Sequence, residues 1–410
     1  MELLRFATIG SVDDGKSTLI GRLLYDSQKI LDDQLSVLQK NSEEIQFALL
    51  TDGLRAEREQ GITIDVAYRY FETSKRKFIV ADCPGHVQYT RNAITGLSNV
   101  NAAVILIDAT RGIQNQTKRH AFLVSLLQVS HLIVCVNKMD RVSFDEAVFR
   151  EIREEFENYA DSLTVKDIHF IPMSALRGDN VVRGSENMPW YSGRSLLDQL
   201  EELHISSDQN RIDFRFPVQQ VLLQKGETEG DSRYYLGRVA SGGIRVGEKI
   251  QILPSGFSTS ISAIYFSGRR VEEAHCGMSV QIQLEDPVDV SRGDMIARLN
   301  NLPKSAQDLS AIVFWMTSEP LDYSKRYYLK QTTQTTRCVF KESLYRFDVE
   351  TLHRDSSATA YGLNDIGRVS IRTANRIHYD AYRDNRKTGS FTICDPDTKR
   401  TIAGGILIDR

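Results

Sequence analysis

Five short apolar runs in the first half of the chain constrain its fold more than any other feature of the sequence. None of these runs alternates apolar with polar residues, and longer amphipathic stretches separate each run from the next. Strands that are apolar on both faces belong to parallel sheets covered by helices on both sides. The runs occupy residues 3–9, 77–82, 101–108, 131–138 and 168–175. Repeated units of this kind predict a doubly wound, mostly parallel α/β domain over residues 1–205.

The stretches between the apolar runs predict helices and one edge strand. Apolar residues recur at helical spacing over residues 16–26, 116–128 and 144–160. Residues 66–73 instead alternate apolar and polar side chains, as in a strand with one exposed face. We therefore expect this last segment to pair at an edge of the sheet.

The pattern changes after the polar stretch at residues 203–211, which we interpret as a linker. Short alternating segments now follow one another, separated by turns rich in Gly and Ser. That pattern is typical of all-β barrels. We expect one barrel domain at residues 212–304 and a second at residues 305–410. The predicted strands include residues 214–223, 311–317, 327–340, 366–373 and 404–409.

The composition argues against several classes of protein. The formal net charge is -3 and the pI is about 6.3, so charge gives no support for a nucleic-acid partner. No apolar run reaches the roughly 18 residues of a membrane helix, and the N-terminus lacks the features of a signal peptide. The five cysteines are scattered and form no CxxC pair. Together these observations predict a cytoplasmic protein without a disulfide framework or a zinc site.

The loop after the first apolar run carries a phosphate-binding motif. Gly10, Gly15, Lys16 and Ser17 satisfy the pattern G-x-x-x-x-G-K-[ST] between a predicted strand and a predicted helix. The backbone N–H groups of such a loop surround phosphate oxygens, while Lys16 reaches the outer phosphates and Ser17 holds Mg²⁺. An ordinary glycine-rich turn is the alternative, and the strand–loop–helix setting argues against it. We expect the loop to contact the nucleotide also through Val12, Asp13, Asp14 and Thr18.

A second segment, DCPGH at residues 82–86, ends the run at 77–82. Asp82 can hold a Mg²⁺-bound water at this strand end, and Gly85 can present its N–H to a terminal phosphate. In isolation the segment would more simply be a turn that ends a strand. Its place beside the phosphate-binding loop favours the functional interpretation.

Two further segments predict recognition of guanine. In NKMD, at residues 137–140, Asp140 can accept hydrogen bonds from N1–H and the exocyclic amine of guanine, which adenine lacks. Asn137 would contact the purine edge and brace the phosphate loop, and the stem of Lys138 would cover the ring. In the second segment, the N–H of Ala175 would meet guanine O6. That segment comprises Ser174, Ala175 and Leu176.

A charged segment at residues 57–65 precedes the predicted edge strand. Its Thr63 matches a switch threonine that completes the Mg²⁺ shell while the γ-phosphate is present. A solvated charged loop is the plain alternative. The other loops follow successive parallel strands, whose carboxyl ends form the ligand-binding edge of an open α/β sheet. The combination predicts a domain that binds GTP or GDP with Mg²⁺.

At this point the sequence resembles GTPases of the elongation factor Tu type over nearly its whole length. Within that group it is more similar to the large, GTPase subunits of heterodimeric bacterial sulfate adenylyltransferases. The resemblance implies a P-loop GTPase domain followed by two β-barrels. The segments that carry the closer resemblance are residues 10–27, 52–73, 82–92, 188–193 and 215–221.

The resemblance also implies a mechanism and partners. GTP hydrolysis would drive a smaller catalytic ATP sulfurylase subunit, which joins ATP and sulfate to give adenosine 5′-phosphosulfate and pyrophosphate. Adenylylsulfate kinase is a further partner that the resemblance suggests. His86 matches the histidine that orients the attacking water, screened by an apolar pair at Val12 and Ile62. The catalytic set implied in this way is His86, Thr63, Gly85 and Lys16.

Two other functions remain open from the sequence. The barrels are compatible with a factor that delivers aminoacyl-tRNA in a GTP-dependent way, although the chain carries no positive net charge. A GTP switch that binds a partner without transferring energy is the other alternative. Neither alternative explains the closer resemblance, so the sequence favours the sulfate-activating GTPase.

Overall fold

A computed structural model describes residues 2–27, 63, 65–165, 167–205, 210–224 and 232–409, with Val87 and Ser232 described by their backbone alone. The chain forms two compact units. The first contains Met1–Asp208 and Val349–Leu352, and the second contains Gln209–Asp348 and His353–Arg410.

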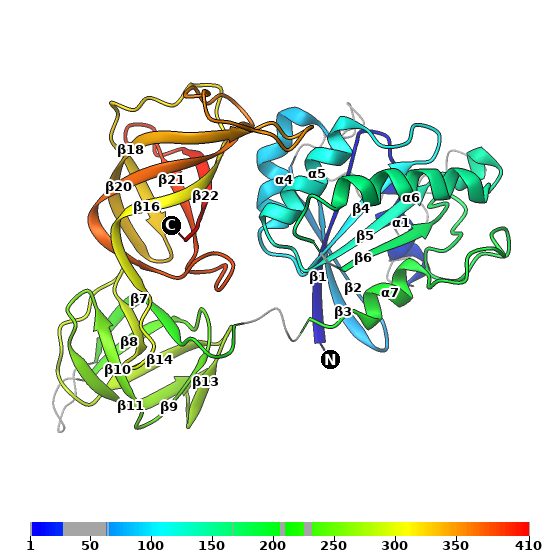
Figure 1. The fold of residues 1–410 in the computed structure, drawn as a ribbon. Coiled ribbons are helices and arrows are strands. Elements are labelled where there is room, and N and C mark those ends of the chain that lie inside the picture. The colour runs from blue at the N-terminus through cyan, green and yellow to red at the C-terminus, as the bar shows by residue number, and fades with distance from the viewer. Residues whose placement is uncertain are drawn as a thin grey trace. The chain divides into compact units, whose positions relative to one another are not determined.

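A six-stranded sheet forms the centre of the first unit (Figure 1). Its strands are β1 (Glu2–Gly10), β2 (Ala67–Glu72), β3 (Arg76–Asp82), β4 (Ala102–Asp108), β5 (His131–Asn137) and β6 (Asp167–Pro172). They lie in the order β2-β3-β1-β4-β5-β6, and every neighbouring pair is parallel except β2 with β3. The five apolar runs and the edge strand are therefore confirmed as strands.

Helices cover both faces of this sheet. They are α1 (Lys16–Asp26), α4 (Thr90–Leu97), α5 (Asn115–Leu126), α6 (Glu146–Ala160) and α7 (Leu196–Glu202), with 3-10 turns η2 (Val87–Tyr89) and η3 (Met139–Val142). Apolar residues of α1 and α7, among them Leu19, Leu23 and Leu200, share one core with Phe6 of β1 and Ile133 of β5. Helices α4 and α5 pack against β1, with α4 also contacting β3 and α5 contacting β4.

The longest described helix, α6, shows why the sequence favours helices here. Its buried residues Phe149, Ile152, Phe156 and Ala160 recur at helical spacing and form one apolar stripe. The side chain of Asp145 accepts a hydrogen bond from the N–H of Ala147 at 2.8 Å and so caps the first turn. The sequence thus specifies both the start of this helix and the face it buries.

The register of the parallel strands aligns their carboxyl ends. Thr8 of β1 pairs with Asp82 of β3, and Asp108 of β4 pairs with Asn137 of β5. The chain direction across the sheet reverses at β1, which has β3 on one side and β4 on the other. Ligands bind open α/β sheets outside the carboxyl ends of the strands at such a reversal. The fold therefore creates its binding edge where β1, β3, β4 and β5 end.

Two closed barrels of six strands make up most of the second unit. The first barrel comprises β7 (Arg215–Gln224), β8 (Ser232–Arg238), β10 (Lys249–Leu253), β11 (Ser258–Phe266), β14 (Ser279–Leu284) and β15 (Met295–Arg298). The second comprises β16 (Lys304–Trp315), β17 (Tyr327–Gln331), β18 (Gln334–Phe347), β20 (Ile366–Tyr379), β21 (Ser390–Cys394) and β22 (Thr401–Leu407). Short strands flank them: β9 (Gly243–Arg245), β12 (Arg269–Val271), β13 (Glu273–His275) and β19 (Arg354–Asp355). The predicted class, an α/β domain followed by two barrels, is confirmed.

One predicted strand differs from the structure. The stretch at 327–340 is a hairpin, in which β17 and β18 are joined by Thr332 and Thr333. Thr332 has a φ of 49°, in the left-handed region that a β-branched residue seldom occupies. Because threonine favours strands, local propensity gave no signal for this turn. Trp315 and Tyr327 lie buried in the core of the second barrel.

A buried ion pair joins the two barrels. The guanidinium of Arg215 lies 2.8 Å and 3.0 Å from the two carboxylate oxygens of Asp380, and its side chain is 2% exposed. Arg215 also donates to the carbonyl of Asn301 at 2.8 Å. Removing one partner of a buried pair costs about 3–5 kcal/mol, because it leaves an uncompensated charge. The pair therefore resists separation of the barrels.

In the part of the chain that the structure describes, no helix is both long and apolar enough to cross a bilayer. All five cysteines are free, and four of them are buried.

Candidate functional site

The loops predicted from the sequence converge on one cavity of about 540 Å³ in the first unit. Most of the predicted residues line it: Val12, Asp13, Gly15, Lys16, Ser17, Thr18, Thr63, Gly85, His86, Asn137, Lys138, Asp140, Ala175 and Leu176. The predicted residues that do not line it are Gly10, Asp14, Asp82 and Ser174. Gly10, Asp14 and Ser174 are hydrogen-bonded to Lys16, Asn137 and Asp140, which do line it. Segments far apart in the sequence therefore share one concave site.

The phosphate-binding loop closes tightly at its base. Gly15 has a φ of 97°, and a Cβ at this position would lie 2.4 Å from Nδ2 of Asn137. Only glycine accepts both the backbone conformation and this approach. The side chain of Asp14 accepts a hydrogen bond from the N–H of Ser11 at 2.6 Å. The ammonium of Lys16 donates to the carbonyls of Gly10 and Ser11 at 3.0 Å and 2.7 Å.

Burial perturbs both charged groups inside the loop. Burial lowers the pKa of Lys16, against the opposing attraction of Asp14 and Asp82. Burial also raises the pKa of Asp14 to about 6, although Lys16 and the N–H of Ser11 favour its charged form. A polyanion in the cavity would offset the cost of burying the lysine charge. The electrostatics of the loop therefore suit a phosphate ligand.

The DCPGH segment lies directly against this loop. A Cβ on Gly85 would stand 2.5 Å from both the carbonyl oxygen of Gly10 and the ammonium of Lys16. Because a Cβ would clash with the carbonyl of Gly10, a glycine is needed for this segment to lie so close to the loop. His86 is half-buried and lines the same cavity, and its Nδ1 accepts a hydrogen bond from the N–H of Gln88 at 3.3 Å.

The predicted metal ligands offer the oxygen atoms that Mg²⁺ prefers. The hydroxyl-bearing residues Ser17 and Thr63 line the cavity, and Asp82 lies at the end of β3 with 2% of its surface exposed. Asp82 accepts a hydrogen bond from the hydroxyl of Thr8 at 3.3 Å. This donor set fits a magnesium ion. Ile62, predicted to screen His86, lies outside the described residues, as does most of the segment at 57–65.

The base-recognition loops hold each other in place. The hydroxyl of Ser174 donates to Oδ1 of Asp140 at 2.6 Å, which fixes a carboxylate that lines the cavity. Asn137 donates from Nδ2 to the carbonyl of Asp14 at 2.7 Å. Its Oδ1 accepts the N–H of Ala175 at 2.9 Å, so this N–H, predicted for guanine O6, already has a partner. Asn137 thus ties the phosphate loop to the base-recognition loop.

Sequence reasoning missed Asp108, which ends β4 at the same edge of the sheet. Its carboxylate lies 2.7 Å from the ammonium of Lys138. Burial alone would raise the pKa of Asp108, but hydrogen bonds from Lys138 and Thr110 hold it below its usual value. The sequence did contain a signal for Asp108. An aspartate ends the apolar run at 101–108, just as Asp82 ends the run at 77–82.

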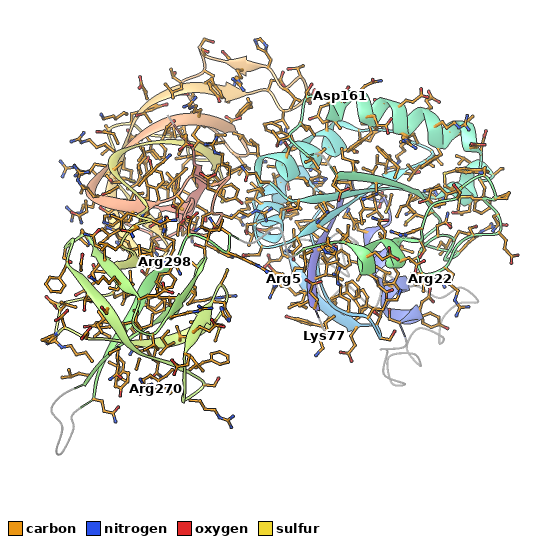
Figure 2. The ribbon with its side chains drawn as sticks, turned by 60° about the horizontal axis from the view of Figure 1, so that its bottom comes forward. Arg5, Arg22, Lys77, Asp161, Arg270 and Arg298 are labelled. Carbon is orange, nitrogen blue, oxygen red and sulfur yellow. The ribbon has the colours of Figure 1, made fainter. Side chains whose placement is uncertain are left out.

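Two other supporting residues were also missed. Arg22 of α1, labelled in Figure 2, donates from Nε to the carbonyl of Ala175 at 3.3 Å and so supports the base-recognition loop. Trp190 donates from Nε1 to the carbonyl of Phe144 at 3.1 Å. Phe144 ends the loop that carries Asp140 and has a φ of 57°, which is unfavourable for a bulky residue. Trp190 therefore helps to hold a strained segment beside the base site.

The fold and the site define a P-loop nucleotide-binding protein with a guanine-type base loop. Comparisons with known proteins agree. The protein-family model of the elongation factor Tu GTP binding domain matches residues 1–206, and the model described as GTP-eEF1A C-terminal domain-like matches residues 308–408.

Similar sequences show which family of nucleotide-binding proteins the chain belongs to. The chain is 51% identical to the "Bifunctional enzyme CysN/CysC" of Mycobacterium tuberculosis, over 99% of this chain and 67% of that protein. It is 50% identical to "Sulfate adenylyltransferase subunit 1" of Bacteroides fragilis, over 100% of this chain and 86% of that protein. The relative of the same name in Teredinibacter turnerae is 47% identical over 100% of this chain and 88% of its own length. The chain therefore belongs to the sulfate adenylyltransferase subunit 1 family, within the GTPases of the elongation factor Tu type.

A solved structure has the same fold. The Ski7 GTPase-like domain of S. cerevisiae, bound to GTP, superimposes with a TM-score of 0.55 at 20% sequence identity. The match covers 100% of this chain and 98% of that one. At this level of identity the likeness concerns the fold alone.

Proposed function

We propose that this chain is the GTPase subunit of a heterodimeric sulfate adenylyltransferase. The observation that carries the proposal is the identity of about half of all residues with sulfate adenylyltransferase subunits, along the whole chain. The cavity formed by the phosphate-binding loop, the DCPGH segment and the base-recognition loops supplies the chemistry. The partner would be a smaller subunit that binds ATP and sulfate.

Each group of site residues has its own role in GTP cleavage. Lys16 and the loop N–H groups hold the β- and γ-phosphates, and the N–H of Gly85 contacts the terminal phosphate. His86 orients the attacking water, which is a matter of position more than of basicity. Thr63 would join the Mg²⁺ ligands only while the γ-phosphate is present. When bound by Ser17, Thr63 and Asp82, Mg²⁺ would neutralise phosphate charge.

The energetic role follows from the chemistry of the product. The phosphate–sulfate anhydride is unstable, so its formation from ATP and sulfate is uphill. GTP cleavage on this chain would be coupled to that step on the partner. A protein that then phosphorylates the product, an adenylylsulfate kinase, is a further proposed partner, since the relative in Mycobacterium tuberculosis is named bifunctional. The free cysteines support a reducing cytoplasm as the location.

The test is the rate of GTP turnover by the purified chain mixed with its partner subunit. We expect turnover to rise when ATP and sulfate are both present, and to stay low when either is omitted. Omitting one substrate at a time is the control, because the protein concentrations do not change. A rate indifferent to ATP and sulfate would contradict the proposal and leave a simple GTP switch. Recovery of tRNA, and no ATP-binding subunit, with the purified chain would favour an RNA-delivery factor.

A further inference from the structure

The cavity contains a positive charge that the roles above do not use. Four cationic side chains line it among the described residues: Lys16, Arg111, Lys138 and Arg141. Lys16 belongs to the phosphate-binding loop, and Lys138 is paired with Asp108 at 2.7 Å. Arg141 directly follows Asp140, on the loop that recognises the base. Arg111 comes from the turn after β4, which carries none of the predicted motifs.

The turn after β4 fixes the backbone of Arg111. Its N–H and that of Gly112 both donate to the carbonyl of Asp108 at 3.0 Å, and Gly112 has a φ of 65°. The side chain of Asp108 accepts hydrogen bonds from the N–H and hydroxyl of Thr110 at 2.9 Å and 2.7 Å. A tight turn with this many internal bonds holds Arg111 at the carboxyl edge of the sheet.

The guanidinium of Arg111 reaches the rim of the phosphate-binding loop. Its Nη1 donates to the carbonyl of Val12 at 3.4 Å, and its Nε lies 4.0 Å from Oδ2 of Asp108. That oxygen already binds Lys138 at the shorter distance of 2.7 Å, so Arg111 is the weaker partner. A guanidinium carries five N–H groups in a planar fork. In the described part of the chain, most of those N–H groups therefore remain available to a ligand.

We infer that Arg111 is a catalytic residue for GTP cleavage, supplying from within the chain a positive charge to the phosphate groups. This inference rests on the proposed function. Water attacks the γ-phosphorus, the bond to the β–γ bridging oxygen breaks, and that oxygen keeps the electron pair as a terminal oxygen of GDP. The proton of the water leaves with the phosphate product or passes to solvent. An arginine over the phosphate chain stabilises the charge that develops during this step.

Arg111 and Lys16 have different roles in GTP cleavage. Lys16 is buried against the loop and contacts phosphate in the ground state, so its loss would weaken binding of both GTP and GDP. The side chain of Arg111 is 51% exposed and meets the loop at the carbonyl of Val12. Its contribution is therefore expected in the cleavage step and less in binding of GDP.

The test measures single-turnover GTP cleavage by the full chain carrying Arg111→Ala, in the presence of its partner subunit, ATP and sulfate. We expect the rate to fall by on the order of 10²-fold or more, as for other cases of lost charge stabilisation, while GDP affinity changes by less than about threefold. Arg111→Lys should retain part of the rate. Guanidinium ions added to the Arg111→Ala variant should raise its rate, and they should not raise that of the wild type. Rescue of this kind would not occur if the arginine were merely structural.

The control is Arg153→Ala on α6, since that side chain is also 51% exposed and lines no part of this cavity. It should cleave GTP at the wild-type rate. An Arg111→Ala variant that cleaves GTP within threefold of wild type overturns the inference and leaves the proposed function intact. Equal losses of GTP and GDP affinity at an unchanged rate overturn it as well. A wild-type chain that cleaves no GTP even with its partner subunit, ATP and sulfate present overturns both.

Discussion

Replacing Asp140 by asparagine is expected to lower the affinity for GTP by on the order of 10⁴-fold and to make xanthosine triphosphate the preferred nucleotide. The hydroxyl of Ser174 donates to one oxygen of Asp140 at 2.6 Å. In the variant that hydroxyl would hold the amide oxygen, so the NH₂ group would face the base. Guanine presents donors at this position, whereas xanthine presents a carbonyl oxygen that can accept. Because Ser174 fixes the orientation of the side chain, replacing one carboxylate oxygen by an NH₂ group is expected to change the preferred nucleotide from GTP to xanthosine triphosphate.

The measurement is competitive binding of GTP and xanthosine triphosphate to the wild type and the variant. Asp161→Asn is a matched control, since Asp161 is an exposed residue at the end of α6 (Figure 2) and should leave both affinities unchanged. A variant at Asp140 that binds GTP as tightly as the wild type would show that this carboxylate does not recognise the base.

Replacing Gly85 by alanine is expected to reduce GTP cleavage by on the order of 10²–10³-fold, the usual loss for one preorganised donor. The new Cβ would lie 2.5 Å from the carbonyl oxygen of Gly10, which belongs to a strand and cannot move aside. The DCPGH segment must then shift away from the phosphate-binding loop. That shift removes the N–H of Gly85 from the terminal phosphate and displaces His86. Because GDP lacks the terminal phosphate, its affinity should change by less than about tenfold.

Single-turnover cleavage and GDP binding, measured on the same preparation, separate these effects. Gly184→Ala serves as the control, because a Cβ built there has no atom of the described residues within 4 Å apart from its own chain neighbours, and the φ of Gly184 is not in the left-handed region. The control should match the wild type in both assays. If Gly85→Ala cleaved GTP at the wild-type rate, the close approach of the DCPGH segment to the phosphate-binding loop would not contribute to catalysis.

The sheet of the first unit could be predicted from sequence because each strand had its own signal. A strand such as β4, with all seven residues buried, is apolar along its whole length and needs no context to be recognised. The hairpin of β17 and β18 could not be predicted, because Thr332 and Thr333 favour extended structure. Its turn depends on the pairing of the two strands, which no local window contains.

The candidate site was predictable where a motif fixes spacing along the chain, as for Lys16 and Asp140. Its supporting contacts were not, because they join distant segments. Lys138 meets Asp108 only because β4 and β5 are parallel and in register at their carboxyl ends. Arg111 reaches Val12 for a similar reason. A sequence window shows an arginine in a turn, and only the sheet order places that turn beside the phosphate loop.

The central claim is that GTP cleavage on this chain drives an uphill reaction on its partner. The most direct test measures how much adenosine 5′-phosphosulfate accumulates when the purified chain, its partner subunit, ATP and sulfate reach a steady level. With GTP present, the level should rise well above that reached without GTP, and a non-hydrolysable GTP analogue should give no rise. The same level of adenosine 5′-phosphosulfate with GTP, without GTP and with the analogue would contradict the account, because GTP cleavage would then not drive the partner's reaction.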